Sequence, residues 1–330
     1  MSSGDRHRAV RVALCLLLIP ALLSAQYVET IVVSRIIFDV RVTDGPGDPI
    51  LGLTAEDFTV EIGGKRATVE SATWVPDTVA ARAVAAVDEP EPVPAGPEEQ
   101  ALPDGRLIIV FIQTDFARNT ERIRGQMGFL THAKAIVEAL EPHDRVAVFS
   151  FDSHLKFRLD FTADKERVGE VIAEAMKIDL PPPPPIVPNP ALARRLDRDA
   201  MRAATDSEGA LILIGNALRP IPGPKSMLLL GWGLGEMVGG RVYMKSKYEI
   251  AKRTLEAARV TVFALDTTYA EYHSLEVGLS KAAKDTGGFY AKTHVFPQLA
   301  VERLQRTLAG HYELEVRRPE GIRPGAHAVT

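Results

Sequence analysis

The chain has 330 residues, 46% of them hydrophobic, and a formal net charge of −4 at pH 7. This hydrophobic content is sufficient for a sizeable core and excludes global disorder, while the mildly acidic balance disfavours a general nucleic-acid-binding protein. The length allows roughly two domains with their linkers. The single cysteine, Cys15, lies in a segment that we expect to be removed, which excludes disulfides, thiolate catalysis and cysteine zinc sites in the mature chain.

Residues 1–25 have the organisation of a secretory signal peptide. Three arginines precede the apolar residues 12–23, and Ser24-Ala25 supplies small residues before a cleavage point. A membrane anchor is the alternative, but the apolar stretch is shorter than the roughly 20 residues that a span requires. We therefore expect a secreted or periplasmic protein, which contacts a membrane only through this segment if it stays uncleaved.

Residues 26–75 are predicted to form a small β-rich unit. Alternating apolar residues predict a strand within residues 35–42, and Thr54 is placed to cap a short helical turn. Gly63-Gly64, between two strand-like segments, predicts a hairpin. Residues 76–105 are rich in proline, alanine and acidic residues, so we expect a linker that buries little surface.

Strand-like and helix-like segments alternate in residues 106–310, which predicts an α/β domain with a doubly wound, mostly parallel sheet flanked by helices. Four short apolar runs have the composition of strands buried on both faces, at residues 107–112, 145–151, 226–230 and 260–265. The alternating segment 155–161 predicts an antiparallel edge strand. Helices are expected at residues 120–140, 164–177, 208–218, 248–258, 274–284 and 297–308.

A proline-rich insertion and a terminal segment complete the predicted organisation. The insertion, residues 180–198, contains a proline run that predicts polyproline II structure, and we interpret it as a spacer in preference to a proline-rich ligand. In the terminal segment, residues 311–330, the alternating Tyr312, Leu314 and Val316 predict a further strand, followed by a polar tail.

The order and spacing of these elements resemble those of a von Willebrand factor type A (VWFA) domain, and the leading β unit is similar to that of the VWFA-related proteins of the Acidobacteria. The resemblance is carried by DGPGDPILGLTAEDFTVEIGGK, LIIVFI, DRVAVFSF, VTVFALD and DTGGFY, which begin at residues 44, 107, 144, 260 and 285. It implies a Rossmann-like fold and a role in adhesion or complex assembly.

The resemblance also indicates where a Mg²⁺ site would lie, because many members of the family bind the ion through a D-x-S-x-S loop and two further loops. Here Gln113 occupies the position of the first Asp, and Asp115 and Ala117 replace the two serines. Thr205 matches the Thr of the second loop, but the Asp of the third falls at Gly231-Trp232. Mg²⁺ requires several oxygen ligands. We therefore expect a degenerate site with no metal or other cofactor, and at most weak Mg²⁺ binding.

The same residues have an alternative role in backbone capping, which we prefer. Gln113, Asp115 and Asn119 would cap the following helix and satisfy backbone amides at the sheet edge. Since open α/β sheets bind ligands outside the carboxyl ends of their strands, these positions still mark the predicted partner-binding crevice. Its residues are Gln113, Asp115, Asn119, Thr205, Trp232 and Asp266. Trp232, in a glycine-rich loop expected to be mobile, is either an exposed anchor for a partner or packed against Met237 or Tyr243.

The sequence shows no catalytic signature. It has no Walker A motif, G-x-S-x-G or HExxH, and no histidine is visibly paired with a nucleophile. A hydrolase with a non-local triad stays a distant alternative. We therefore expect a non-enzymatic protein–protein interaction module that uses its carboxyl-end loops, with an unidentified protein as partner and no nucleic acid. The main alternative is a structural or assembly protein that acts through the N-terminal β unit or the terminal strand.

Overall fold

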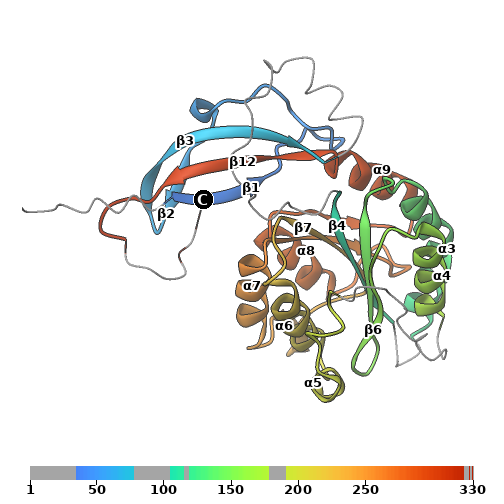
Figure 1. Ribbon diagram of the computed structural model, residues 1–330. Helices are drawn as coiled ribbons and strands as arrows, with labels where there is room; N and C mark the ends of the chain where they lie inside the picture. Colours follow the sequence, from blue (N-terminus) through green and yellow to red (C-terminus); the bar gives the residue numbers. More distant parts are fainter. Residues whose placement is uncertain are drawn as a thin grey trace, which may run out of the picture. The chain divides into compact units, whose positions relative to one another are not determined.

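The computed structural model describes residues 35–77, 105–114, 119–177 and 191–322, together with residues 327 and 329 (Figure 1). The predicted signal peptide, nearly all of the predicted linker, Asp115 and the proline run lie outside the described residues. Within the described part of the chain, none of the helices combines the length and apolar composition needed to span a bilayer.

A six-stranded sheet with the order β11-β10-β7-β4-β5-β6 forms the centre of the α/β part. Its strands are β4 (Leu107–Gln113), β5 (Arg145–Phe151), β6 (Leu155–Thr162), β7 (Lys225–Gly231), β10 (Val260–Asp266) and β11 (Tyr290–Lys292). Five strands run parallel, and β6 pairs antiparallel with β5 at one edge, as its alternating sequence predicts. β4, β7 and β10 are buried along their whole length, which explains why apolar residues predominate in them.

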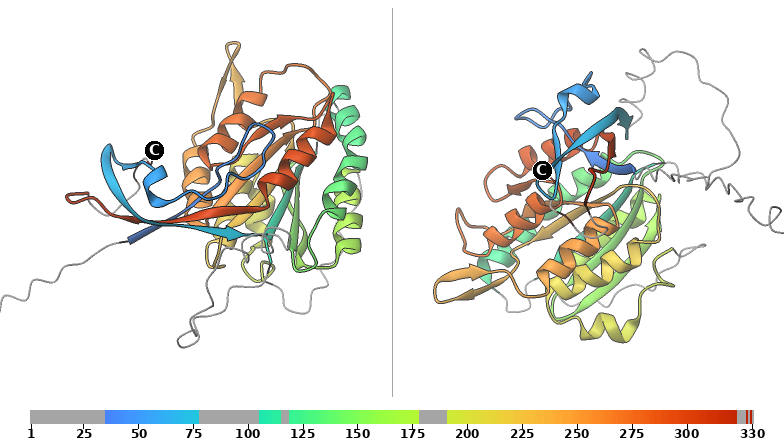
Figure 2. Two further views of the ribbon diagram at one scale, coloured as in Figure 1. Left: turned by 90° about the horizontal axis from the view of Figure 1, so that it is seen from above. Right: turned by 90° about the vertical axis from the view of Figure 1, so that its left-hand side faces the viewer.

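Helices cover both faces of this sheet (Figures 1 and 2). They are α3 (Thr120–Glu138), α4 (Lys165–Met176), α5 (Arg198–Ala203), α6 (Ser207–Leu218), α7 (Tyr248–Ala257), α8 (Glu276–Asp285) and α9 (Pro297–Thr307). Helices α6, α7 and α8 contribute to one apolar core, and α3, α4 and α9 contribute to the core on the other face. The chain therefore has the predicted α/β class, a central sheet flanked by helices.

A separate four-stranded antiparallel sheet has the order β1-β12-β3-β2. Its strands are β1 (Arg35–Val40), β2 (Val60–Ile62), β3 (Lys65–Pro76) and β12 (Gly310–Arg317), and a 3-10 turn, η1 (Ala55–Asp57), precedes β2. The hairpin predicted at Gly63-Gly64 and the turn predicted after Thr54 are both present. The two ends of the described chain thus build one sheet, shown in Figure 1 as blue strands beside a red one.

The terminal strand β12 lies inside this sheet, between β1 and β3. Tyr312 anchors it: the ring packs against Phe58 and Trp74, with centroids 5.6 and 5.2 Å apart, and the hydroxyl donates to the Ile50 carbonyl at 3.0 Å. Since both edges of β12 are paired, this strand cannot add to a partner's sheet. The version of the alternative hypothesis that used the terminal strand is therefore wrong.

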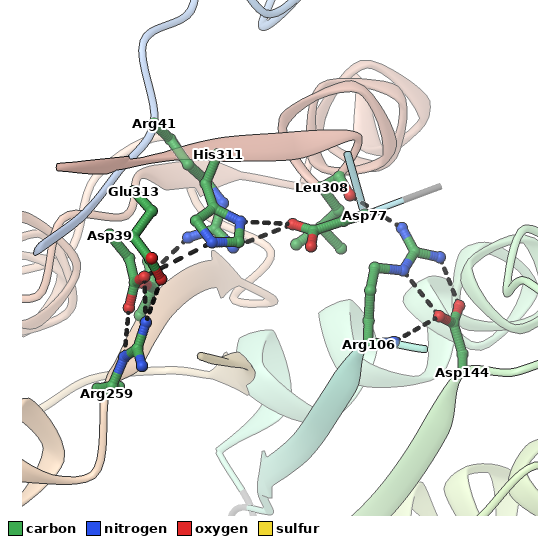
Figure 3. Close-up of polar contacts among 10 residues, drawn as sticks. Asp39, Arg41, Asp77, Arg106, Asp144, Arg259, Leu308, His311 and Glu313 are labelled. Carbon is green, nitrogen blue, oxygen red and sulfur yellow. Dashed lines mark hydrogen bonds and ion pairs between the residues drawn. The ribbon is translucent and has the colours of Figure 1, made fainter. Parts of the chain in front are cut away.

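A charged cluster joins the four-stranded sheet to the amino ends of the parallel strands (Figure 3). Arg259, just before β10, donates from Nε and Nη2 to the Asp39 carboxylate of β1 at 2.8 and 2.6 Å. His311 of β12 is buried, with Nδ1 3.0 Å from Asp77 Oδ2 and Nε2 3.5 Å from Asp39 Oδ1. This attachment places the four-stranded sheet and the predicted crevice at opposite ends of the parallel strands.

Candidate functional site

Gln113, the last residue of β4, fills the point where the strand order reverses. β4 lies between β5 and β7, so the crevice expected in open α/β sheets falls between the carboxyl ends of β4 and β7. The Gln113 side chain is buried there, and its Nε2 donates to Ser207 Oγ and to the Gly233 carbonyl, both at 2.9 Å. Its Oε1 accepts from the Trp232 and Gly233 amides at 3.0 and 3.2 Å. All the hydrogen-bonding capacity of the amide is therefore used.

This arrangement leaves no free oxygen on the Gln113 side chain for a metal ion. The one oxygen that Gln113 could offer to a cation already accepts two backbone amides. A Cβ atom at Gly231 would lie 2.2 Å from Gln113 Oε1, so a carboxylate residue at 231 is incompatible with the observed Gln113 conformation. The absence of a side chain at Gly231 and the position of the Gln113 amide are thus coupled by packing. The predicted role of Gln113, satisfying backbone amides at the sheet edge, is confirmed.

The other positions predicted for the crevice have different outcomes. Asn119 caps α3, accepting from the Glu121 and Arg122 amides at 3.1 and 3.2 Å, as predicted. Thr205 is exposed, and the hydroxyl that accepts from Gln113 Nε2 belongs to Ser207. The residues that reach the crevice from this segment are instead Ser207 and Glu208, both buried at the start of α6. A serine and a glutamate opening an otherwise apolar helix were the sequence signal for them.

Glu208 and Trp232 hold the loop that follows β7. Glu208 Oε1 accepts from the Gly235 amide at 2.9 Å, and the guanidinium of Arg122 stacks on the Trp232 ring at 3.8 Å. The half-buried Trp232 is therefore fixed to α3. The glycine-rich loop beyond it, predicted to be mobile, contains a regular hairpin of β8 (Glu236–Val238) and β9 (Arg241–Tyr243).

Asp266 is the centre of a second polar network, at the carboxyl end of β10. Its Oδ2 accepts from the Tyr290 hydroxyl at 2.8 Å and lies 2.6 Å from His273 Nε2, and its Oδ1 accepts from the Thr268 amide at 3.0 Å. Burial raises the pKa of Asp266, but these hydrogen bonds outweigh burial and hold the pKa below its usual value. Sequence reasoning left His273 unpaired, because its partner is seven residues away across a loop.

Exposed hydrophobic side chains are concentrated at this end of the sheet. Most of those in the described part of the chain lie on the carboxyl-end loops or on the helical turns that follow them: Met237, Val238, Tyr243, Tyr269, Tyr272, Val277, Val295, Phe296 and Leu299. Tyr272 is 68% exposed and Phe296 58%. The β8–β9 hairpin projects from the domain (Figure 2). Single exposed hydrophobic residues are ordinary, but a concentration of them is typical of a binding surface.

The chain matches no protein-family model, and no curated protein matches it. Solved structures do match. A von Willebrand factor type A protein from Catenulispora acidiphila is 13% identical, with a TM-score of 0.42, over 61% of this chain and 42% of that one. The human COPII-coat protein Sec24c is 12% identical, with a TM-score of 0.41, over 66% and 39%. The conserved hypothetical protein BatB from Bacteroides thetaiotaomicron is 12% identical, with a TM-score of 0.38, over 61% and 98%.

The chain spans less than half the length of the first two of these proteins. Similarities of this size assign neither a family nor a function. The fold class stands on the strand order and packing of the chain itself: a mixed α/β structure whose central sheet is flanked by helices, with its candidate functional surface at the carboxyl ends of the strands.

Proposed function

We propose that the protein is an exported protein–protein interaction module of the VWFA type, which binds a protein partner with its carboxyl-end loops. The observation that carries the proposal is the concentration of exposed apolar and aromatic side chains on those loops. The sequence resemblance supports the VWFA assignment, and the arginine-rich, apolar N-terminus supports export. The proposal assigns no catalysis to the chain.

The chemistry of the exposed side chains fits a protein partner. Aromatic residues and methionine are enriched in the cores of protein interfaces, and tyrosine is among the residues enriched at hot spots. Part of this surface is already ordered: the guanidinium of Arg124 stacks on the Tyr269 ring at 3.8 Å, and the Tyr269 amide donates to the Glu121 carbonyl at 3.0 Å. An ordered aromatic side chain loses less conformational entropy when a partner binds.

Binding would not use the family's Mg²⁺, because Gln113 fills that position and its oxygen is engaged. Millimolar Mg²⁺ added to metal-free protein should therefore leave the melting temperature unchanged, since an ion that binds the native state must stabilise it. A rise in melting temperature that disappears in a Gln113→Ala variant would contradict this part of the proposal.

The binding surface can be tested by affinity capture from the native envelope fraction. A Tyr272→Ser/Phe296→Ser double variant should lose the partner that the wild type retains. Ile250→Ser is the matched control, because Ile250 is 56% exposed but lies on α7, outside these loops, and it should retain the partner. Retention by the double variant, with loss in an Ile37→Lys variant of edge strand β1, would place the interaction on the four-stranded sheet instead.

A further inference from the structure

We propose that Asp266, His273 and Glu276 form a binding site for a divalent transition-metal ion, of which Zn²⁺ is the best fit. Each residue offers one ligand atom, and the three atoms lie within 4.8 Å of one another. The site lies two strands away from the position that Gln113 fills, with β7 between β10 and β4, so it is distinct from the Mg²⁺ site that the family resemblance implies.

The fold brings these three side chains together from one segment of chain. Asp266 ends β10, His273 lies in the loop that follows, and Glu276 opens α8. The loop is folded back on the helix start: the His273 amide donates to Glu276 Oε2 at 3.3 Å, and the Glu276 amide donates to the His273 carbonyl at 3.3 Å. Both side chains are thereby held beside the buried Asp266 carboxylate.

The donor set selects the kind of ion. Imidazole nitrogen is a good ligand for Zn²⁺ and related transition metals, whereas Mg²⁺ and Ca²⁺ take oxygen ligands. One histidine and two carboxylates match the number of protein ligands in open zinc sites, where a water takes the fourth position. His273 Nε2 and Asp266 Oδ2 are now 2.6 Å apart, a hydrogen-bond distance. Two tetrahedral zinc ligands lie about 3.3 Å apart, so the ion would replace the hydrogen between them after a small rotation of the imidazole.

The surroundings have features that a metal site requires. The Tyr290 hydroxyl donates to Asp266 Oδ2 at 2.8 Å, and Lys292 Nζ lies 2.8 Å from Glu276 Oε2, so both carboxylates are oriented by outer partners from β11. Thr268, in the same turn as Asp266, is 6% exposed, and its Oγ1 has no hydrogen-bond partner. An open cavity of about 500 Å³ is lined in part by Glu276 and Tyr290, so it adjoins the site on the side of Glu276.

The test is isothermal titration of the metal-free full chain with Zn²⁺. We expect one ion per chain, and binding at least about tenfold weaker in Glu276→Gln, which keeps the size of the side chain, and in His273→Ala. His132→Ala is the control for adventitious histidine binding and should bind Zn²⁺ like the wild type. Co²⁺ should give the visible absorption of a four-coordinate site in the wild type but not in Glu276→Gln.

Two results would overturn the site: no stoichiometric Zn²⁺ binding by the wild type, or unchanged Zn²⁺ affinity in a folded Glu276→Gln variant. The site does not rest on the proposed protein partner, because the titration contains none.

Discussion

Replacing Gln113 by alanine should destabilise the protein strongly, because it removes the cross-link between β4, α6 and the loop after β7. Four hydrogen bonds of 2.9–3.2 Å are lost. The buried amide of Gly233, its carbonyl and the Ser207 hydroxyl are left without this partner. Each unsatisfied buried group costs about 1–3 kcal/mol, but groups in one network are not additive. We therefore expect a loss of about 3–4 kcal/mol in the free energy of unfolding.

The assay is urea unfolding followed by far-ultraviolet circular dichroism, with Asn119→Ala as control. Asn119 also satisfies two backbone amides, but at an exposed helix start, where loss of a cap costs about 1 kcal/mol. Gln113→Glu keeps the size of the side chain and tests only the hydrogen bonds that Nε2 donates. A carboxylate could still accept the two amides, but it would face the Gly233 carbonyl that Nε2 now contacts at 2.9 Å. If Gln113→Ala is no less stable than Asn119→Ala, the account of the crevice is wrong.

Three further predictions concern other parts of the structure. Arg259→Ala, which breaks the partly exposed double hydrogen bond to Asp39, should cost about 2 kcal/mol and speed amide hydrogen exchange in β1. Burial, followed by the charge of Arg259, lowers the pKa of Lys225 from 10.5 to about 8. Between pH 8 and 10.5 the unfolded state therefore binds one more proton than the folded state, and the free energy of unfolding should rise with pH. The rise should be at most about 1.4 kcal/mol per pH unit. Urea titrations of the wild type and of Lys225→Met, which lacks the titrating group, measure it. Arg122→Ala removes the stack on Trp232 and should cost about 0.5–1 kcal/mol, with a change in tryptophan emission.

The main strands and helices could be predicted because their pattern is local. The short, mainly apolar runs of β4, β7 and β10 identify strands buried on both faces, and the alternation in β6 identifies an edge strand. The partners of β12 could not be predicted. The alternation of Tyr312, Leu314 and Val316 shows that one face is buried, but it does not say that the neighbouring strands begin more than two hundred residues earlier.

In the candidate site, the sequence predicted the residues that satisfy backbone amides. A carboxamide at the end of β4 and an asparagine before α3 suit capping, and both do cap or satisfy amides. Thr205 was assigned to the crevice by aligning the chain with the family's metal-binding pattern across the proline run. In the structure, Ser207 contacts Gln113 there. The Asp266–His273 contact depends on how a loop folds back, which no periodicity reports.

The most direct test of the central claim, that the carboxyl-end loops bind a protein, is site-specific photo-cross-linking in the native envelope fraction. A photoreactive residue at position 272 should cross-link to a protein partner, and the same residue at position 250, on α7, should not. Both positions are exposed, with Tyr272 at 68% and Ile250 at 56%, so accessibility alone predicts similar yields. Equal cross-linking at the two positions, or cross-linking at 250 alone, would contradict the account.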